Sequence, residues 1–384
     1  MTEAGRRRLT LAFAGFLIAV VIGGFFVGRS LQVAVLESSS GSVSEVVLDP
    51  AAPGFRAFTD ATPTLLVVHT TVTSRGAELV GATILAPAGE GIGGAVVTFQ
   101  STFVVDASSP TLAEVFTSSG LDPLVAQLGA VTGSGFSDVV VLDASAWTSL
   151  MREDLPLDVS LRTDLIEVEQ GVSSTLLPSG TRSFDLFDIA LIASHQNPSE
   201  PSLGLALRQQ EIWRSWISRT AGSDERPELF ELDTGFSAVI GALASGEVSY
   251  RPIPTSTLSD VPPETTRYLA DDQAIRELFA QIVPFPQEVE PGDRPPVLLL
   301  DSTLGQLDRD EFVQIITASG GRVTILGNTD GEPEAVNRVQ LHDPSGAELA
   351  DVLVDEFGAE LEDVPLEDAT AALTVIMATP PASS

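Results

Sequence analysis

The sequence predicts an α/β protein with two extracytoplasmic domains behind one transmembrane helix. Apolar, strand-like runs alternate with helical patterns, a proline-rich stretch divides the chain, and an uncharged apolar run lies near the N-terminus. Apolar residues make up 43% of the 384 residues, which is ample for packed cores. The expected parts are a cytoplasmic tail (1–8), a transmembrane helix (9–28), a linker (30–45), a first domain (46–286), a Pro/Glu-rich linker (287–296), a second domain (297–379) and a tail (380–384).

The N-terminal apolar run is long enough to cross a membrane. Residues 9–28 carry no charge, and twenty residues of helix span about 30 Å, the thickness of the hydrocarbon layer. Arg6, Arg7 and Arg8 precede the run, which places the N-terminus in the cytoplasm and the remaining chain outside. A cleaved signal peptide would have a shorter apolar region and a small-x-small site, and residues 30–33 offer no clear one. We therefore expect a single-pass cell-membrane protein.

Charge and cysteine content exclude several kinds of chemistry. The chain has no cysteine, so disulfides and thiolate catalysis are unavailable. Its formal net charge is −33, which does not provide the basic footprint of a nucleic-acid-binding protein. The three histidines are scattered and do not form a zinc pattern. We expect no nucleic-acid partner, no metal ligands and no cofactor.

In the first domain, strands and helices alternate as in an α/β sheet with helices on both faces. Strands are predicted at 64–70, 78–85, 94–99, 138–143, 159–168, 189–194 and 248–252, and helices at 111–128, 144–151, 205–214, 236–244 and 272–282. The segment 187–219 is interpreted as a strand, a polar loop (195–202) and a helix. Such an arrangement often handles phosphate, because the start of a helix offers free N–H groups.

The second domain is predicted to follow a β-α-β-β-α-β order, which matches the ferredoxin-like, split βαβ pattern. Its expected strands are 297–300, 322–326, 337–341 and 372–377, and its expected helices are 308–319 and 345–357.

Several segments resemble the LytR-CpsA-Psr (LCP) family of cell-envelope proteins. Thr64–His69 resembles the opening strand of the family's catalytic domain, Asp138–Leu150 its central strand and helix, and Leu207–Gln210 its Arg-Gln helix. Residues 297–379, with the run Gly-Gly-Arg-Val-Thr-Ile-Leu-Gly-Asn at 320–328, resemble the LytR C-terminal domain. The resemblance implies a layered α-β-α domain with a mixed central sheet.

The resemblance also implies an activity, the transfer of glycopolymers from a polyprenyl-pyrophosphate carrier to peptidoglycan. That chemistry needs arginines for the pyrophosphate, carboxylates for a divalent metal such as Mg²⁺, and an apolar groove for the lipid. This sequence departs from the family pattern at each motif. Gln100 stands in place of an Arg, Ser101 in place of an Asp, and Ala193-Ser194-His195 in place of Arg-x-Arg. In the helix motif, only Arg208 and Gln209 match.

We therefore interpret the first domain as a catalytically degenerate relative. It would be a scaffold, or a binder of glycopolymer, polyprenyl lipid or an envelope partner. One alternative is an active phosphotransferase with shifted residues, which would need Mg²⁺. Another is an interaction module whose function lies in residues 297–384. The candidate ligand-binding residues are Arg208, Gln209, Gln100, Ser101, His195 and Arg182.

For each candidate a structural role competes with a ligand-binding one. Arg208 could retain an anion contact or pair with an acid such as Glu211. His195 is expected in a solvated loop, and His69 in an apolar strand as a structural residue. Trp213 and Trp216 are expected to pack rather than to bind sugar.

Overall fold

The structure is a computed structural model, and it describes residues 47–88, 93–150, 156–222, 234–258, 266–366 and 369–381. The expected transmembrane segment, 9–28, lies outside these residues. Among the helices that are described, none combines the length and apolar character needed to cross a membrane. The described residues from 50 onward form one unit.

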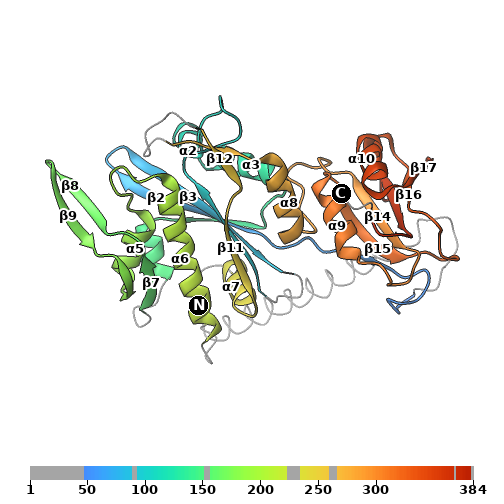
Figure 1. Ribbon diagram of the computed structural model, residues 1–384, viewed down its shortest axis with the longest axis horizontal. Coiled ribbons are helices and arrows are strands. Elements are labelled where there is room, and N and C mark those ends of the chain that lie inside the picture. Colours follow the sequence, from blue (N-terminus) through green and yellow to red (C-terminus); the bar gives the residue numbers. More distant parts are fainter. Residues whose placement is uncertain are drawn as a thin grey trace, which may run out of the picture. The chain divides into compact units, whose positions relative to one another are not determined.

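A five-stranded mixed sheet organises the first half of this unit (Figure 1), in the order β11-β4-β3-β2-β6. The three central strands are antiparallel, whereas β6 runs parallel to β2 and β11 runs parallel to β4. Their bounds are β2 Leu65–Thr73, β3 Gly76–Pro87, β4 Gly94–Gln100, β6 Asp138–Leu142 and β11 Val248–Pro252. All five strands were predicted near these positions, and the mixed α/β class is confirmed.

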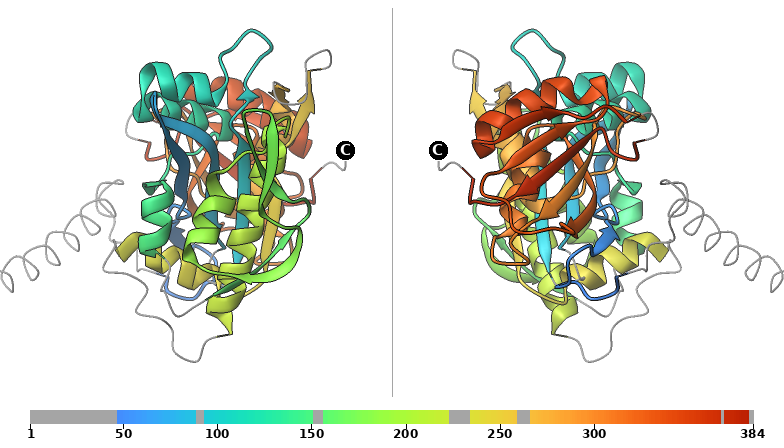
Figure 2. Two further views of the ribbon diagram at one scale, coloured as in Figure 1. Left: turned by 90° about the vertical axis from the view of Figure 1, so that its left-hand side faces the viewer. Right: turned by 90° about the vertical axis from the view of Figure 1, so that its right-hand side faces the viewer.

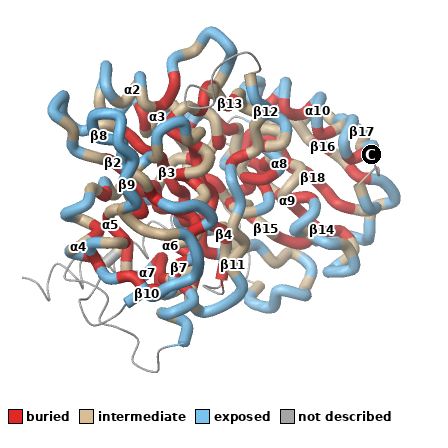
Figure 3. The backbone as a smooth tube through the Cα atoms, turned by 60° about the vertical axis from the view of Figure 1, so that its left-hand side comes forward, coloured by how far each residue is buried: buried red, intermediate tan, exposed pale blue. Residues whose placement is uncertain are grey.

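Helices cover both faces of this sheet, because successive side chains of a strand point to opposite sides. Leu65 and Val67 face one core, while Leu66 and Val68 face the other. The first core includes α4 Ala144–Leu150, α5 Leu186–Ser194, α6 Ser202–Ala221 and α7 Thr234–Leu243. The second includes α2 Leu112–Ser119, α3 Leu121–Thr132 and α8 Asp272–Ile282. Figure 3 shows buried residues along the central strands between these layers.

The strand predicted at 189–194 is wrong, because these residues belong to helix α5. Asp185 caps this helix by accepting hydrogen bonds from the N–H groups of Phe187 and Asp188. The apolar run is too short for its periodicity to separate a buried helix from a buried strand. The capping aspartate was the sequence signal that decided for the helix.

Two small antiparallel sheets of two strands each are formed by residues 157–184, between α4 and α5 in sequence. β7 (Leu157–Leu161) pairs with β10 (Gly180–Phe184), and β8 (Leu165–Glu169) pairs with β9 (Val172–Leu177). The single strand predicted at 159–168 is therefore two strands. A further small sheet joins β12 Thr255–Thr257, β13 Tyr268–Ala270 and β5 Phe103–Val104.

The C-terminal sheet has six strands in the order β1-β15-β14-β18-β16-β17 (Figure 2, right). Its strands and helices are β1 Arg56–Phe58, β14 Pro296–Asp301, α9 Arg309–Ala318, β15 Arg322–Asn328, β16 Arg338–Leu341, η3 Pro344–Gly346, α10 Ala347–Phe357, β17 Glu360–Asp363 and β18 Leu373–Met377. Helices α9 and α10 pack on a core shared with β14, β15, β16 and β18.

The ferredoxin-like topology predicted for this sheet is wrong. A split βαβ unit leaves space for another strand between its two parallel strands, whereas β14 and β15 pair directly and in parallel. A direct βαβ unit and a split one have the same order of elements along the chain, so the order could not separate them. Strand β1, which precedes the first domain's sheet in sequence, pairs antiparallel with β15.

Candidate functional site

A group of buried polar residues, here called the polar seam, lies where the central sheet meets helix α6. Register places Gln100 of β4 beside Gly81 of β3, and Gly81 beside His69 of β2. Two residues further along the same face of the sheet, Thr98 of β4 lies beside Thr83 of β3. All four polar side chains are at most 1% exposed. The seam is completed from α6 by Gln209, which is fully buried.

Gln209 is seated against the sheet because Gly81 has no side chain. A Cβ atom on Gly81 would lie 2.5 Å from Oε1 of Gln209 and 3.2 Å from the carbonyl oxygen of Phe99. The Nε2 group of Gln209 donates a hydrogen bond of 2.9 Å to the carbonyl oxygen of Ala193. This bond fixes the amide so that its oxygen, an acceptor, faces the seam.

Several polar atoms of the seam have no hydrogen-bond partner among the described residues. They are Nδ1 of His69, Oγ1 of Thr98, Oε1 of Gln100 and Oε1 of Gln209. A buried polar atom without a partner costs on the order of 1–3 kcal/mol. The amide oxygen of Gln209 would be complemented by a donor, such as water or a hydroxyl group. A phosphate oxygen, itself an acceptor, would be repelled.

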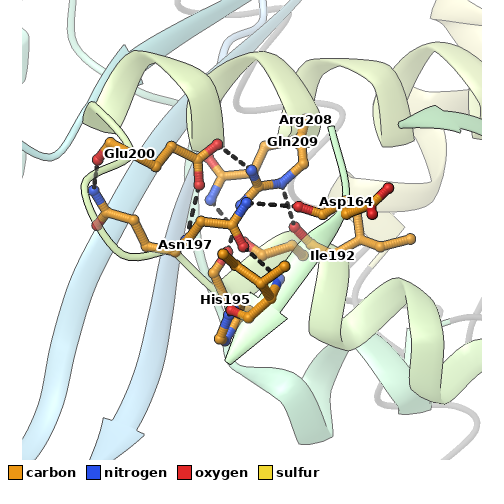
Figure 4. Close-up of polar contacts among 10 residues, drawn as sticks. Asp164, Ile192, His195, Asn197, Glu200, Arg208 and Gln209 are labelled. Atoms are coloured by element: carbon orange, nitrogen blue, oxygen red, sulfur yellow. Dashed lines mark hydrogen bonds and ion pairs between the residues drawn. The ribbon is translucent and has the colours of Figure 1, made fainter. Parts of the chain in front are cut away.

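Arg208 is turned away from the sheet and toward the end of helix α5 (Figure 4). Its Nη1 binds the carboxylate of Glu200, and its Nη2 donates to the carbonyl oxygen of His195. Its Nε donates weakly to the carbonyl oxygen of Ile192, at 3.5 Å. Together with Gln209, Arg208 therefore supplies donors to backbone carbonyls at 192, 193 and 195. Carbonyls at the end of a helix need such partners, so this arrangement caps α5.

The loop between α5 and α6 is in turn bonded to strand β8. Nε2 of His195 lies 2.8 Å from the carbonyl oxygen of Ile166, and Oδ1 of Asn197 accepts the Ile166 N–H at 2.8 Å. Nδ2 of Asn197 donates to the carbonyl oxygen of Asp164 (Figure 4). His195 is thus a structural contact of this hairpin, and the solvated-loop interpretation is only partly right because the ring is hydrogen-bonded.

His69 sits at the apolar end of the seam among the chain's three tryptophans. Its ring stacks on Trp147 at 5.7 Å between centroids, with 7° between the planes, and lies 6.2 Å from Trp213. Nε2 of His69 lies 2.9 Å from the hydroxyl of Thr83. Burial lowers the pKa of His69 from 6.5 to about 3, because the imidazolium would lose its hydration. The prediction of a structural His69 agrees with this environment.

Aromatic rings fill the interior beside the seam. Trp147, Trp213 and Trp216 lie 5.3–6.4 Å apart between ring centroids, and Phe236 lies 6.0 Å from Trp216. Each of these side chains is at most 6% exposed. The rings pack against one another, as the sequence predicted for Trp213 and Trp216.

The remaining candidates lie apart from one another. Ser101 is buried at the end of β4, where its carbonyl oxygen accepts the N–H of Ala113. Arg182 is an exposed residue of β10, a strand that is not part of the central sheet. Of the six candidates, the structure therefore brings Gln100 and Gln209 together, with Arg208 beside them but facing away.

Sequence reasoning missed the partners that decide these roles. Glu200 is the acid that holds Arg208, whereas Glu211 pairs with Arg214 at 3.5 Å. Glu200 lies in a loop, eight residues before Arg208, which no helical spacing would indicate. Among the described residues no group of three or more His, Cys, Asp or Glu could hold a metal ion.

This chain is similar to known proteins in fold and not in sequence. No protein-family model and no curated protein matches the sequence. Similar solved structures include TagV of B. subtilis, with 12% identity, a TM-score of 0.45, and coverage of 58% of this chain and 96% of that one. TagT bound to LIIa-WTA is 13% identical, with a TM-score of 0.44 and coverage of 63% and 93%.

A third similar structure is the LytR-CPS2A-psr family protein YwtF (TagT) with bound octaprenyl pyrophosphate lipid. It is 12% identical, with a TM-score of 0.43 and coverage of 63% of this chain and 92% of that one. Likeness at such identities says nothing of activity, and the LytR C-terminal domain stays a prediction. These neighbours are LCP proteins, the family that the sequence resembles, and the likeness extends to the fold alone.

Proposed function

We propose that this chain is a membrane-anchored, extracytoplasmic cell-envelope protein that binds an envelope component without transferring it. The observation that carries the proposal is the direction of Arg208 and Gln209. Both side chains donate to carbonyls at the end of α5, and the charge of Arg208 is matched by Glu200. Neither side chain is left to hold a pyrophosphate.

The seam also does not fit a magnesium-pyrophosphate group. Mg²⁺ prefers carboxylate oxygens, and the seam contributes hydroxyls, amides and a neutral imidazole. Gln100 and Ser101 stand where the resemblance expects charge, and neutral groups do not replace a bidentate guanidinium or an anionic ligand. The alternative of an active phosphotransferase is therefore not favoured.

For the ligand, we propose cell-wall glycopolymer first and a polyprenyl-linked lipid second. The printed names of two neighbours mention LIIa-WTA and octaprenyl pyrophosphate, which fits an envelope ligand of this kind. The aromatic rings beside the seam are buried and pack against one another, so they fill this part of the interior. This packing favours a ligand bound at the surface, or a scaffolding role, over a lipid taken into the core.

The test of catalysis uses the full chain in detergent, polyprenyl pyrophosphate and Mg²⁺, with release of phosphate or transfer of glycan as the readout. We expect no turnover above the protein-free rate. A matched pair of variants is Arg208→Ala and Arg214→Ala, two arginines of α6, the second of which is half exposed. Turnover that Arg208→Ala abolishes and Arg214→Ala keeps would overturn the proposal.

Binding and location are tested separately. Sedimentation with purified cell wall should retain the full chain, and wall stripped of its glycopolymers should retain less. Cell fractionation should place the full chain in the membrane and a chain lacking residues 1–29 outside it. Equal retention by intact and stripped wall would reject glycopolymer as the ligand.

A further inference from the structure

The β8–β9 hairpin is a two-stranded sheet that projects from the described fold (Figure 1). Its tip exposes Val168 (46%) and Val172 (69%), and residues 172–175 are all exposed. No described strand pairs with the outer edge of β9. An isolated hairpin is marginal in water, so something must hold it in place.

The turn defines which backbone groups point outward. Gln170 and Gly171 have φ angles of 54° and 82°, as in a two-residue type I′ turn. In such a hairpin the pair next to the turn, Glu169 and Val172, is hydrogen-bonded, and hydrogen-bonded pairs alternate with non-bonded ones. Ser173 and Thr175 therefore direct their N–H and C=O groups away from β8.

The opposite edge of the hairpin supports this assignment. Ile166 is paired with Thr175, so its own N–H and C=O should point outward from β8. Both groups are bonded, the N–H to Asn197 and the C=O to His195. The loop that Arg208 and Glu200 organise thus occupies part of the β8 edge and fixes the hairpin. On the edge of β9, the N–H and C=O groups of Ser173 and Thr175 therefore stay directed away from β8.

Residues 172–175 of strand β9 lack the features that protect edges, and the one bulge of this strand lies beyond them, at Leu176. Monomeric proteins place charges, prolines or bulges on exposed edge strands, because an open edge pairs with other chains. The exposed sequence of β9, Val-Ser-Ser-Thr, contains neither a charge nor a proline. The hydroxyl and valine side chains suit a strand environment.

We propose that the β9 edge is a docking site for an extended, basic segment of another protein, added as a third strand. This mode of binding uses main-chain hydrogen bonds for affinity and side chains for specificity. Charge identifies the partner: Glu167 and Glu169 lie on β8, and the two strands with their turn, residues 165–177, contain no basic residue, whereas Arg162 and Arg182 lie outside them. A second copy of this chain, with its net charge of −33, would be repelled.

This proposal does not rest on the proposed function, since it uses only the backbone of the hairpin and its charge. The probe is a fluorescent peptide of about eight residues, within the range of about 3–10 residues for a strand, with Lys alternating with Val and Thr. Fluorescence anisotropy with the full chain measures binding. We expect saturable binding that weakens with salt, and no binding of the same peptide with Glu in place of Lys.

Variants of the protein test the edge itself. Ser173→Pro removes one outward N–H, and Ser173→Val keeps that N–H as the matched control. We expect Ser173→Pro to weaken binding about tenfold, the effect of losing one main-chain hydrogen bond, and Ser173→Val to leave it unchanged. Glu167→Gln with Glu169→Gln should weaken binding and reduce its salt dependence.

A peptide methylated at the backbone nitrogens of both edges tests the same hydrogen bonds without altering the protein. It should lose binding even if Ser173→Pro disturbs the hairpin. Equal binding of the methylated peptide, or of the Glu peptide, would overturn the proposal. A full-length dimer that Ser173→Pro dissociates would assign the edge to a second copy and overturn it as well.

Discussion

The guanidinium of Arg208 is bound to the carboxylate of Glu200, and both side chains are largely withdrawn from water, at 8% and 12% exposed. Glu200 also accepts the backbone N–H of Asn197 at 2.9 Å. The pair therefore joins helix α6 to the loop that precedes it. Because both charges are buried, each requires the other as its counter-charge.

Arg208→Ala and Glu200→Ala should each destabilise the protein strongly. Removing one partner leaves the other charge buried and unpaired, which costs about 3–5 kcal/mol. The double variant should lose less than the sum of the two. Arg214→Ala is the control, because its pair with Glu211 is 49% and 31% exposed and is worth about 0–1 kcal/mol, and its contact with the Tyr250 ring adds about 0.5–1 kcal/mol. The free energy of unfolding in urea measures all four, and strictly additive losses would contradict the pairing.

Gly204→Ala should also destabilise, although alanine is the better helix former. A Cβ atom at Gly204 would lie 2.5 Å from Oε1 of Glu200, which Arg208 holds in place. Overpacking of this kind costs about 1–3 kcal/mol. The control is Gly241→Ala in α7, where nothing lies within 4 Å and a gain of about 0.5–1 kcal/mol is expected.

The three atoms nearest to a Cβ on Gly204 all belong to Glu200, so removing Glu200 should remove the clash. In a Glu200→Ala background the obstructing carboxylate is gone, so Gly204→Ala should become neutral or stabilising. Urea unfolding of the four combinations gives the sign directly. A loss of equal size in both backgrounds would mean that some contact other than Glu200 opposes the methyl group.

Much of the fold followed from local patterns. The strand at 248–252 and the helix at 272–282 were predicted to the residue, because each has clear boundaries and periodicity. The failures concern information that is not local. Whether 189–194 is helix or strand depends on how an all-apolar run packs, and whether β14 neighbours β15 depends on the sheet.

At the candidate site, too, local patterns predicted part of the arrangement and long-range packing determined the rest. The sequence located Arg208 and Gln209, but not the directions in which they point. Those directions depend on the end of α5, which was predicted as a strand and so presented no helix carbonyls to cap. Gly81 leaves space for the side chain of Gln209, and this role depends on how α6 packs on β3, for which the sequence alone has no signal.

Arg294 should stabilise the end of helix α9. It is 9% exposed, and its Nη1 donates to the carbonyl oxygens of Thr317 and Gly321 at 3.0 and 2.8 Å. Its Nη2 occupies the space that a Cβ on Gly133 would enter at 2.4 Å, where φ is +64°. Burial lowers the pKa of Arg294, so the guanidinium relies on these carbonyl dipoles.

Arg294→Ala should therefore lower the free energy of unfolding by about 1–3 kcal/mol, the cost of leaving buried acceptors unsatisfied. Gly133→Ala should do the same without removing a charge. Arg276→Ala is the control, since Arg276 lines the same small cavity but is exposed. Urea unfolding measures the three, and equal effects of Arg276→Ala and Arg294→Ala would contradict the specific role of Arg294.

His69 should make the protein less stable in acid. Its pKa is about 3 in the folded state because of burial, and about 6.5 when the ring is exposed on unfolding. Between these values the unfolded chain binds a proton that the folded one does not, so stability falls as pH is lowered from about 7 to about 4, by on the order of a few kcal/mol.

The variant His69→Gln separates this effect from other acid effects, because glutamine can still bond Thr83 and does not titrate. Urea unfolding against pH should show a steeper acid loss for the wild type than for this variant, whose remaining slope reports the other titrating groups. Parallel curves would mean that His69 is protonated without unfolding, and that the stack on Trp147 does not exclude water from the ring.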